Sequence, residues 1–442
     1  MDKMKVAVIG GGSSYTPELI EGFILRAGQM KVDEIALVDI AAGKTKLKII
    51  GELAKRMLKK KGLSTKVTIT FDRVAAITDA DFVLTQFRVG GLDARANDER
   101  IPLKYRVIGQ ETTGPGGFAK ALRTIPVMLE ICREMEAYAP DAWLINFTNP
   151  AGMVTEAVHQ FTNVKAIGLC NVPINMQQMT ADILEVKREE VNMRFAGLNH
   201  LVYGTSVHVK GKDQLDVLIK RIAAGKNMNM KNIYDAPWEE TFLQALRALP
   251  CPYHRYYYMM DDMLEEELKT SREKGTRAEQ VKKIEQALFM TYRDPALDIK
   301  PLELADRGGS LYSEAAVSLI ASIVNNDHAI HTVNVPNNGT ITQLPDDVVV
   351  EVTCMVNREG PQPLQIGKLP TACIGLIQQV KAFEQLTIEA AVKGDTQKAY
   401  LALVANPFVP SSKVAKALLE ELLEINRPYL PQFELKKQAS SV

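Results

Sequence analysis

The sequence has little cysteine and no excess of charge of either sign. Five cysteines, an odd number among 442 residues, do not form a disulfide framework. Lys+Arg and Asp+Glu both number 53, so the formal net charge is zero, which argues against nucleic-acid and polybasic membrane partners. No apolar run reaches the ~18 residues of a spanning helix, and the N-terminus lacks a signal-peptide region. These absences predict a cytoplasmic protein whose cysteines are free thiols or ligands.

The composition is that of a folded enzyme-sized chain. Hydrophobic residues make up 46% and charged residues 24%, which is typical of globular proteins. A length of 442 residues suggests two or three domains. We place one boundary so that residues 1–169 form a first domain and residues 170–435 a second, with residues 436–442 frayed.

Strands alternate with helices in the first 170 residues. Such alternation predicts right-handed crossovers and a parallel, doubly wound sheet of the Rossmann type. Beyond residue 170 the pattern changes to antiparallel strands near 194–209, helices over 235–290 and a hairpin turn at 337–339. The fold class is therefore α/β, with a C-terminal mixed α+β domain. The six expected strands lie at 5–9, 34–39, 66–71, 81–87, 142–147 and 164–169.

A glycine-rich turn connects the first strand to the first helix. Gly10, Gly11 and Gly12, followed by Ser13 and Ser14, let the backbone approach a pyrophosphate at a helix N-terminus. Tyr15 stands where the GxGxxG pattern has its third glycine, so the pattern is incomplete. Asp39, at the end of the second strand, favours NAD over NADP because its carboxylate can accept hydrogen bonds from ribose hydroxyls. The alternative is a tight turn in another doubly wound protein.

Two residues could bind a metal. Cys170 ends the sixth strand and His200 lies in the second domain. One thiolate and one imidazole can hold a divalent first-row ion and leave positions open for substrate and water. By spacing alone, a buried thiol and a core histidine are the commoner interpretations.

Several other polar residues are weaker candidates. Tyr253 begins a run of tyrosines, for which packing of an aromatic helix face is the alternative. Glu111 lies in a glycine-flanked polar loop, and Asn149 follows the fifth strand. Arg95 and Arg277 could bind a phosphate, although each is more often an ordinary surface arginine.

Together these motifs resemble the NAD- and metal-dependent glycosidases of glycoside hydrolase family 4, and most closely their 6-phospho-β-glucosidase branch. The resemblance spans nearly the whole chain. Its stretches include VAVIGGGSSYTPELI from Val6, INFTNP from Ile145, GLCNVPIN from Gly168, GLNH from Gly197 and PYHRYYY from Pro252.

The resemblance implies hydrolysis of 6-phospho-β-glucosides, such as cellobiose 6-phosphate, to glucose 6-phosphate and the aglycone. This family is an exception to the two-carboxylate mechanism of most glycosidases. It implies oxidation at C3 by NAD, removal of the C2 proton, elimination of the C1 substituent, addition of water and return of the hydride. The cofactors that the resemblance implies are NAD and a divalent metal, Mn2+.

The resemblance also implies a role for each site residue. Cys170 and His200 match metal ligands, Tyr253 the base, and Glu111 the acid that orients this tyrosine. Arg95, Asn149, Asn171 and Arg277 match substrate-binding positions. Asn171 stands where the α-glycosidase branch has an aspartate that donates a proton, so the general acid is unassigned.

Two other functions and several properties stay open. A lactate/malate-type dehydrogenase would share the sheet and NAD, but the segment after Cys170 lacks its Asp-x-x-Arg pattern. An NAD-sensing regulator should carry a DNA-binding module or a basic face, and we find neither. Another family 4 specificity is a further alternative. A homodimer or homotetramer is expected, whereas the aglycone preference is not predicted.

Overall fold

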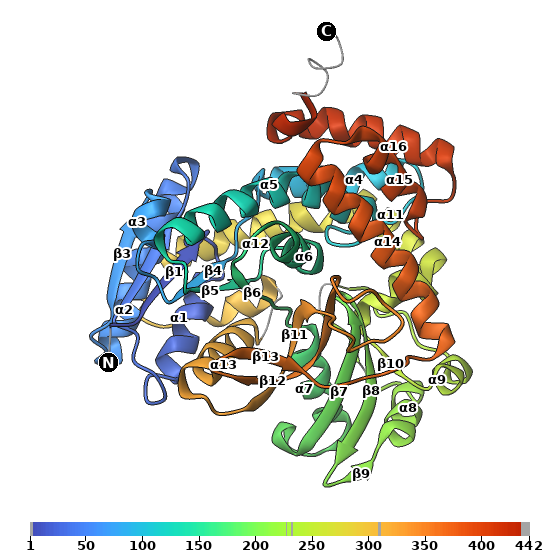
Figure 1. Cartoon of the computed structure of the whole chain (residues 1–442), viewed down its shortest axis with the longest axis horizontal. Coiled ribbons are helices and arrows are strands. Elements are labelled where there is room, and N and C mark those ends of the chain that lie inside the picture. Colours follow the sequence, from blue (N-terminus) through green and yellow to red (C-terminus); the bar gives the residue numbers. More distant parts are fainter. Residues whose placement is uncertain (1–2, 227, 231–232, 308–310, 435–442) are drawn as a thin grey trace.

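The computed structural model of the chain describes residues 3–226, 228–230, 233–307 and 311–434. Six parallel strands form one half of its sheet, as the alternation predicts (Figure 1). They run in the order β3-β2-β1-β4-β5-β6, which is the strand order of a Rossmann fold. Their bounds are β1 (Lys5–Ile9), β2 (Glu34–Val38), β3 (Lys66–Thr70), β4 (Phe82–Thr85), β5 (Trp143–Asn146) and β6 (Lys165–Gly168).

The same sheet continues into the C-terminal half of the chain. β11 lies antiparallel to β6 through Asn334 and Gly168, and the order then runs β12-β7-β8-β10. Because one sheet crosses residue 169, the boundary that we predict there is not a break between sheets, and it stays a prediction. These strands are β7 (Val191–Leu198), β8 (Leu201–Val209), β9 (Lys212–Asp213), β10 (Leu249–Pro250), β11 (Ala329–Pro336), β12 (Val349–Asn357) and β13 (Gly360–Pro363).

The hairpin signal at 337–339 predicts the correct pairing but not the correct connection. β11 and β12 pair antiparallel along their length. Residues 337–348 connect them, and the side chain of Asn337 donates to the carbonyls of Ile341 and Leu344 at 3.0 and 3.1 Å. This asparagine holds a long loop together, so the segment is not a two-residue turn.

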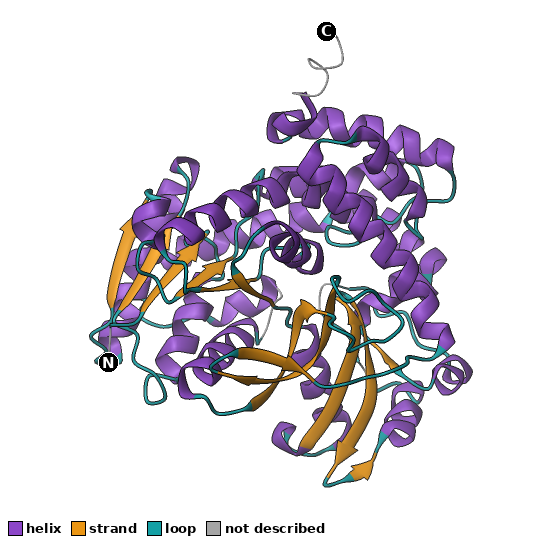
Figure 2. Ribbon diagram, viewed as in Figure 1, coloured by secondary structure: helices purple, strands orange, loops and turns teal. Residues whose placement is uncertain are grey.

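Helices flank the sheet (Figure 2). The predicted helices over 235–290 are present, and Gly394 ends the helix that precedes it with a φ of +62°. The pattern did not predict α4, because buried Asp98 and Glu99 interrupt its apolar face. The bounds are α1 (Thr16–Leu25), α2 (Lys44–Lys60), α3 (Arg73–Ile77), α4 (Gly91–Lys104), α5 (Gly114–Tyr138), α6 (Ala151–Phe161), α7 (Val172–Leu184), α8 (Leu215–Ala223), α9 (Glu240–Leu246), α10 (Arg255–Tyr258), α11 (Met260–Lys274), α12 (Arg277–Tyr292), α13 (Tyr312–Asn325), α14 (Thr371–Lys393), α15 (Thr396–Ala405) and α16 (Ser412–Asn426).

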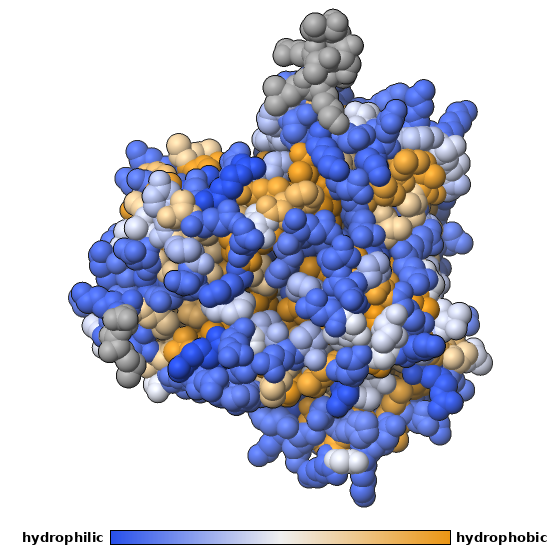
Figure 3. Space-filling view, viewed as in Figure 1, coloured by the Kyte–Doolittle hydropathy of each residue, from blue (hydrophilic) through white to orange (hydrophobic). Residues whose placement is uncertain are grey.

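The visible surface is mostly hydrophilic, with hydrophobic side chains in small groups (Figure 3). Among the described helices, none is both long and apolar enough to cross a membrane. The second domain was predicted to end at 435 and the frayed end to cover 436–442; residues 435–442 lie outside the described residues.

A buried charge cluster joins three elements of the C-terminal half. Lys381 on α14 lies 2.6 Å from a carboxylate oxygen of Glu156 on α6 and 2.5 Å from Glu384 on its own helix. The same Glu156 oxygen accepts a hydrogen bond from the backbone N–H of Val349 at the start of β12. Removing one partner would leave buried charge uncompensated.

We therefore expect Lys381→Met to lower the free energy of unfolding by about 3–5 kcal/mol. Denaturant unfolding of parent and variant measures the difference. Lys393→Met is the control, because Lys393 is exposed and its pair with Glu389 spans 4.0 Å; its cost should stay within about 0.5 kcal/mol. Equal losses in the two variants would contradict the role of the cluster.

Candidate active site

The carboxyl ends of the parallel strands bring most predicted site residues to one edge of the sheet. The glycine turn follows β1, Asn149 follows β5, and Cys170 and Asn171 follow β6. Loops at this edge of a doubly wound sheet are where such folds bind ligands. The remaining candidates come from α4, the loop before α5, the β7–β8 turn and the segment around α10 to α12.

The glycine turn is tightly packed. A Cβ on Gly11 would lie 2.9 Å from the Cβ of Leu37, and one on Gly12 would lie 2.6 Å from a carboxylate oxygen of Asp39. The same Asp39 oxygen accepts from the backbone N–H of Gly12 at 3.1 Å. Burial raises the pKa of Asp39, and hydrogen bonds from Ile40 and Gly12 oppose that shift. Side chains at Gly11 and Gly12 are thus excluded, and Asp39 is fixed against the turn.

The serines after the turn differ in their surroundings. Ser13 Oγ accepts from the backbone N–H of Tyr15 at 3.3 Å. Among the described residues, the buried hydroxyl of Ser14 has no hydrogen-bond partner. The Ser14 carbonyl accepts from the Tyr292 hydroxyl at 2.9 Å, which ties the turn to α12. An unsatisfied buried hydroxyl beside a glycine turn is a ready donor to a bound ligand.

His200 occupies an unusual backbone position. Asn199 and His200 form the turn between β7 and β8, and His200 has a φ of +62°. Its ring stacks on that of Tyr253, with centroids 3.9 Å apart and planes 5° apart. Burial lowers the pKa of His200 to about 3, so the imidazole is neutral at pH 7. A neutral imidazole is the form that binds metals.

Cys170 lies in a buried polar environment beside this turn. Its thiol interacts with the side chain of Asn199, the residue before His200, and lies within electrostatic reach of Glu351. Burial and Glu351 raise the pKa of the thiol well above its usual value. Glu351 accepts from the Asn334 amide at 2.9 Å. Burial also raises the pKa of Glu351, to about 8.

Three cations surround Glu111. Arg88 forms an ion pair with it, and Arg95 and Lys120 each lie 3.0 Å from one of its oxygens. Burial alone would raise the pKa of Glu111, but these cations hold it well below the ordinary 4.5. Burial and Arg88 together lower the pKa of Lys120 to about 7.

Arg95 and Arg277 line one cavity of about 260 Å³ together with Glu111. Arg95 also pairs with Glu99 at 2.7 Å. Burial lowers the pKa of Arg277, and Arg95 and Arg307 lower it further because their charges repel it. The cavity wall thus holds mutually repelling guanidiniums, which an anion would stabilise.

Asn149 and Asn171 hold backbone groups at the same edge. The Asn149 side chain accepts from the backbone N–H of Ala151 at 3.3 Å. Asn171 is the N-cap residue of α7, and its carbonyl accepts from the Asn175 amide at 2.7 Å. The neighbouring Asn146 is fully buried and forms hydrogen bonds with Thr85 and Thr155, which is a structural role.

Sequence reasoning missed Lys120, Glu351 and the pairing of Arg88 with Glu111. A signal existed for two of them, because Lys120 interrupts the apolar run Phe118–Leu122 and Glu351 interrupts an apolar strand. A charge within a buried run needs a partner. Which partner it finds depends on the tertiary structure.

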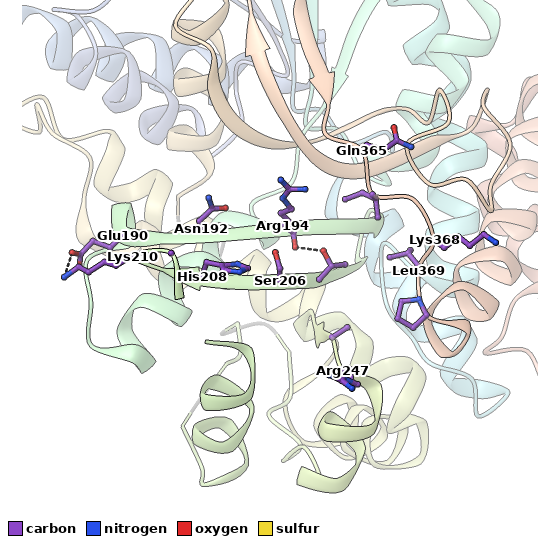
Figure 4. Close-up of a pocket in the computed structure, with 15 residues that line it drawn as sticks. Glu190, Asn192, Arg194, Ser206, His208, Lys210, Arg247, Gln365, Lys368 and Leu369 are labelled. Atoms are coloured by element: carbon purple, nitrogen blue, oxygen red, sulfur yellow. Dashed lines mark hydrogen bonds and ion pairs between the residues drawn. The ribbon is translucent and has the colours of Figure 1, made fainter. Parts of the chain in front are cut away.

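A more open hollow lies elsewhere, on the polar face of β7 and β8 (Figure 4). It measures about 810 Å³ and is lined by side chains such as Arg194, His208 and Arg247. No predicted site residue lines it. Cavity volume alone therefore does not identify the candidate site.

Comparison with known proteins decides the family. A model described as family 4 glycosyl hydrolase matches residues 5–186, and a model of the family 4 glycosyl hydrolase C-terminal domain matches residues 195–409. The chain belongs to family 4 of the glycosyl hydrolases. This confirms the resemblance read from the motifs.

Full-length relatives lie within this family. A probable 6-phospho-beta-glucosidase of Bacillus subtilis is 54% identical over 99% of both chains. A 6-phospho-beta-glucosidase of Escherichia coli is 44% identical over 98% of this chain and 99% of its own.

Solved structures agree with both the family and the fold. The 6-phospho-beta glucosidase of Thermotoga maritima, solved with manganese, NAD+ and glucose-6-phosphate, matches with a TM-score of 0.87 and 40% identity over 96% of this chain and 99% of its own. A malate dehydrogenase of Plasmodium falciparum matches 88% of this chain and 98% of its own at 17% identity with a TM-score of 0.51, which shows a shared fold alone. The predicted α/β fold of lactate/malate dehydrogenase type is thus confirmed.

Glu111 should stabilise the fold in a pH-dependent way. Because its folded pKa is depressed, its contribution is fully present above the unfolded value near 4.5 and is lost as pH falls through the lower folded pKa. We expect Glu111→Gln to cost about 3–5 kcal/mol at pH 7, since buried cations lose their counter-charge. The cost should shrink below pH 4.5. Denaturant unfolding at several pH values measures it.

Glu424→Gln is the matched control, because Glu424 pairs with Arg427 on the exposed surface. Its cost should be within about 0.5 kcal/mol at every pH. A Glu111→Gln cost that grows on acidification would contradict the assigned charge state.

Proposed function

We propose that the chain hydrolyses 6-phospho-β-glucosides, such as cellobiose 6-phosphate, to glucose 6-phosphate and the aglycone, with NAD and a divalent metal, Mn2+, as cofactors. The observation that supports a phosphorylated substrate is the presence of two guanidiniums, those of Arg95 and Arg277, in one cavity. The charge of Arg95 lowers the pKa of Arg277, whereas Glu111 and Glu99 raise the pKa of Arg95, and a phosphate dianion beside the two guanidiniums would relieve the repulsion on Arg277. The names of the full-length relatives support the same substrate class.

The residues around the glycine turn fit NAD. The turn admits no side chains, Ser14 offers an unsatisfied hydroxyl, and the Asp39 carboxylate stands at the end of β2. We assign the binding of the NAD pyrophosphate to the turn, which consists of Gly10, Gly11, Gly12, Ser13 and Ser14. We assign Asp39 to the ribose hydroxyls.

Cys170 and His200 fit a divalent first-row metal. The neutral His200 imidazole can donate a lone pair, and the Cys170 thiol would release its proton on binding. Within the described ranges, no group of three or more His, Cys, Asp or Glu side chains could hold a metal. Substrate oxygens and water would then complete the coordination sphere.

When bound, NAD supplies a reversible hydride acceptor and the metal supplies a Lewis acid. We assign Tyr253 as the base that accepts the C2 proton of the sugar. Its ring is fixed by stacking on His200, and Arg95 lies within electrostatic reach of it. We assign Glu111 the role of positioning Tyr253. Its ion pair with Arg95 holds that arginine within electrostatic reach of the tyrosine. Arg95, Asn149, Asn171 and Arg277 are assigned to substrate binding.

Two further expectations accompany the function. The cytoplasmic location and the assembly into a homodimer or homotetramer stay predictions. The dehydrogenase alternative is not favoured, since the malate dehydrogenase match extends to the fold alone.

Substrate choice tests the function. With NAD and manganese added, the parent should hydrolyse cellobiose 6-phosphate and leave cellobiose nearly untouched, and a chelator should abolish activity. Arg277→Ala should raise KM for the phosphorylated sugar about 10- to 100-fold, because a charged hydrogen bond contributes ~1.5–3 kcal/mol. The affinity for NAD should not change. Arg293→Ala, an exposed position after the same helix, serves as the control. Equal turnover of both sugars by the parent would rule out the phosphate assignment.

Proton exchange tests the base. Product formed in heavy water should carry deuterium at C2, and NAD should be required but not consumed. Tyr253→Phe should slow turnover ~10²–10⁴-fold, because it removes the phenolic oxygen and keeps the ring. Tyr256→Phe is the control, since its ring lies 6.2 Å from that of Tyr253. Product without C2 deuterium would instead indicate direct displacement at C1.

A further inference from the structure

The leaving group of the proposed reaction needs a proton source. When the C1–O bond breaks, its electron pair stays on the glycosidic oxygen, and a sugar or alkyl alkoxide is a poor leaving group unless it is protonated. Asn171 stands after Cys170, and an amide cannot donate a catalytic proton. An acid for this step must therefore come from elsewhere in the site.

The cavity that holds Arg95, Glu111 and Arg277 contains a carboxyl group that none of the assigned roles uses. Glu267, on α11, lines this cavity together with those residues. Its Oε2 accepts a hydrogen bond from the backbone N–H of Gly109 at 2.8 Å. Gly109 begins the loop that carries Glu111, so Glu267 is held against the loop of the candidate site.

The surroundings of Glu267 favour the neutral acid. Burial and, to a smaller extent, the nearby Glu99 carboxylate raise its pKa to about 8 against the opposing hydrogen bond from Gly109. Because Oε2 accepts the Gly109 N–H, the proton of the neutral acid resides on Oε1. Glu99 and Glu111, which line the same cavity, differ from Glu267 because both are in ion pairs with Arg95.

We propose that Glu267 is the general acid that protonates the departing aglycone oxygen. This inference rests on the proposed function. As Tyr253 takes the C2 proton, the electron pair of the C2–H bond forms the C1=C2 double bond, and the C1–O pair stays on the leaving oxygen. That oxygen takes the Glu267 proton and leaves as the alcohol. Water then adds its oxygen to C1 and gives one proton to the Glu267 carboxylate, while Tyr253 returns its proton to C2, so both the acid and the base are restored.

Glu267→Gln separates acid catalysis from loop positioning. Glutamine keeps an acceptor for the Gly109 N–H and the size of the side chain, but it has no transferable proton. We expect cleavage of cellobiose 6-phosphate to fall ~10²-fold or more, in the range of a lost general acid. Cleavage of 4-nitrophenyl β-glucoside 6-phosphate should change much less, because nitrophenolate leaves without protonation. Glu265→Gln is the matched control, since Glu265 lies on the same helix outside the cavity and pairs with Arg106 on the exposed surface.

A second readout reports the step itself. In heavy water, cellobiose 6-phosphate recovered from incomplete reactions of Glu267→Gln should carry more C2 deuterium than that from the parent, because deprotonation continues while departure is slowed. An equal loss on both substrates without extra deuterium would show that Glu267 only positions the loop, and no loss on either would also overturn the proposal. If the parent cleaves neither phosphorylated substrate, the proposed function itself fails, which is a different result.

Discussion

The site is organised around one buried carboxylate. Glu111 is only 14% exposed and is paired with Arg88, Arg95 and Lys120. These partners come from the loop after β4, from α4 and from α5, so a single side chain fixes three segments around the edge of the sheet. Burying a carboxylate is unfavourable unless cations and hydrogen bonds compensate it, and burying those cations requires the carboxylate in turn.

The negative charge near Arg95 does not fully compensate the positive charge there. Arg277 and Arg307 add positive charge close to Arg95, whereas Glu99 and Glu111 supply the nearby negative charge. A dianionic ligand in this cavity would offset that excess. In the proposed function, guanidiniums that are already in position would reduce the reorganisation needed to bind the phosphate.

The antiparallel half of the sheet contributes another part of the candidate site. β12 places Glu351 opposite Gly197 of β7, and the turn that follows β7 presents Asn199 and His200. The single bridge between Asn334 and Gly168 joins this half to the parallel strands next to Cys170. Register between strands that are distant in sequence thus determines which groups surround the thiol. A shift of one residue would turn Glu351 to the other face of the sheet.

Local pattern was sufficient for the parallel half and for the glycine turn. Apolar runs at a strand period, separated by helical stretches, allow few topologies, so the sheet edge that carries Gly10 to Gly12 and Cys170 could be predicted. Full-length motif resemblance extended this to the family. The geometry of the candidate residues could not be predicted in the same way, because no local signal says that Lys120 meets Glu111.

What the sequence by itself determined is the class of fold, the family and the kinds of side chain at the site. Only the tertiary structure decided the insertion of β11 beside β6, the long connection at residues 337–348 and the environments of Glu111, Glu267 and Glu351. The reason is physical. Backbone periodicity is a property of neighbouring residues, whereas burial, ion pairing and strand register arise between different segments that the fold brings together, and these set the charge that each group carries.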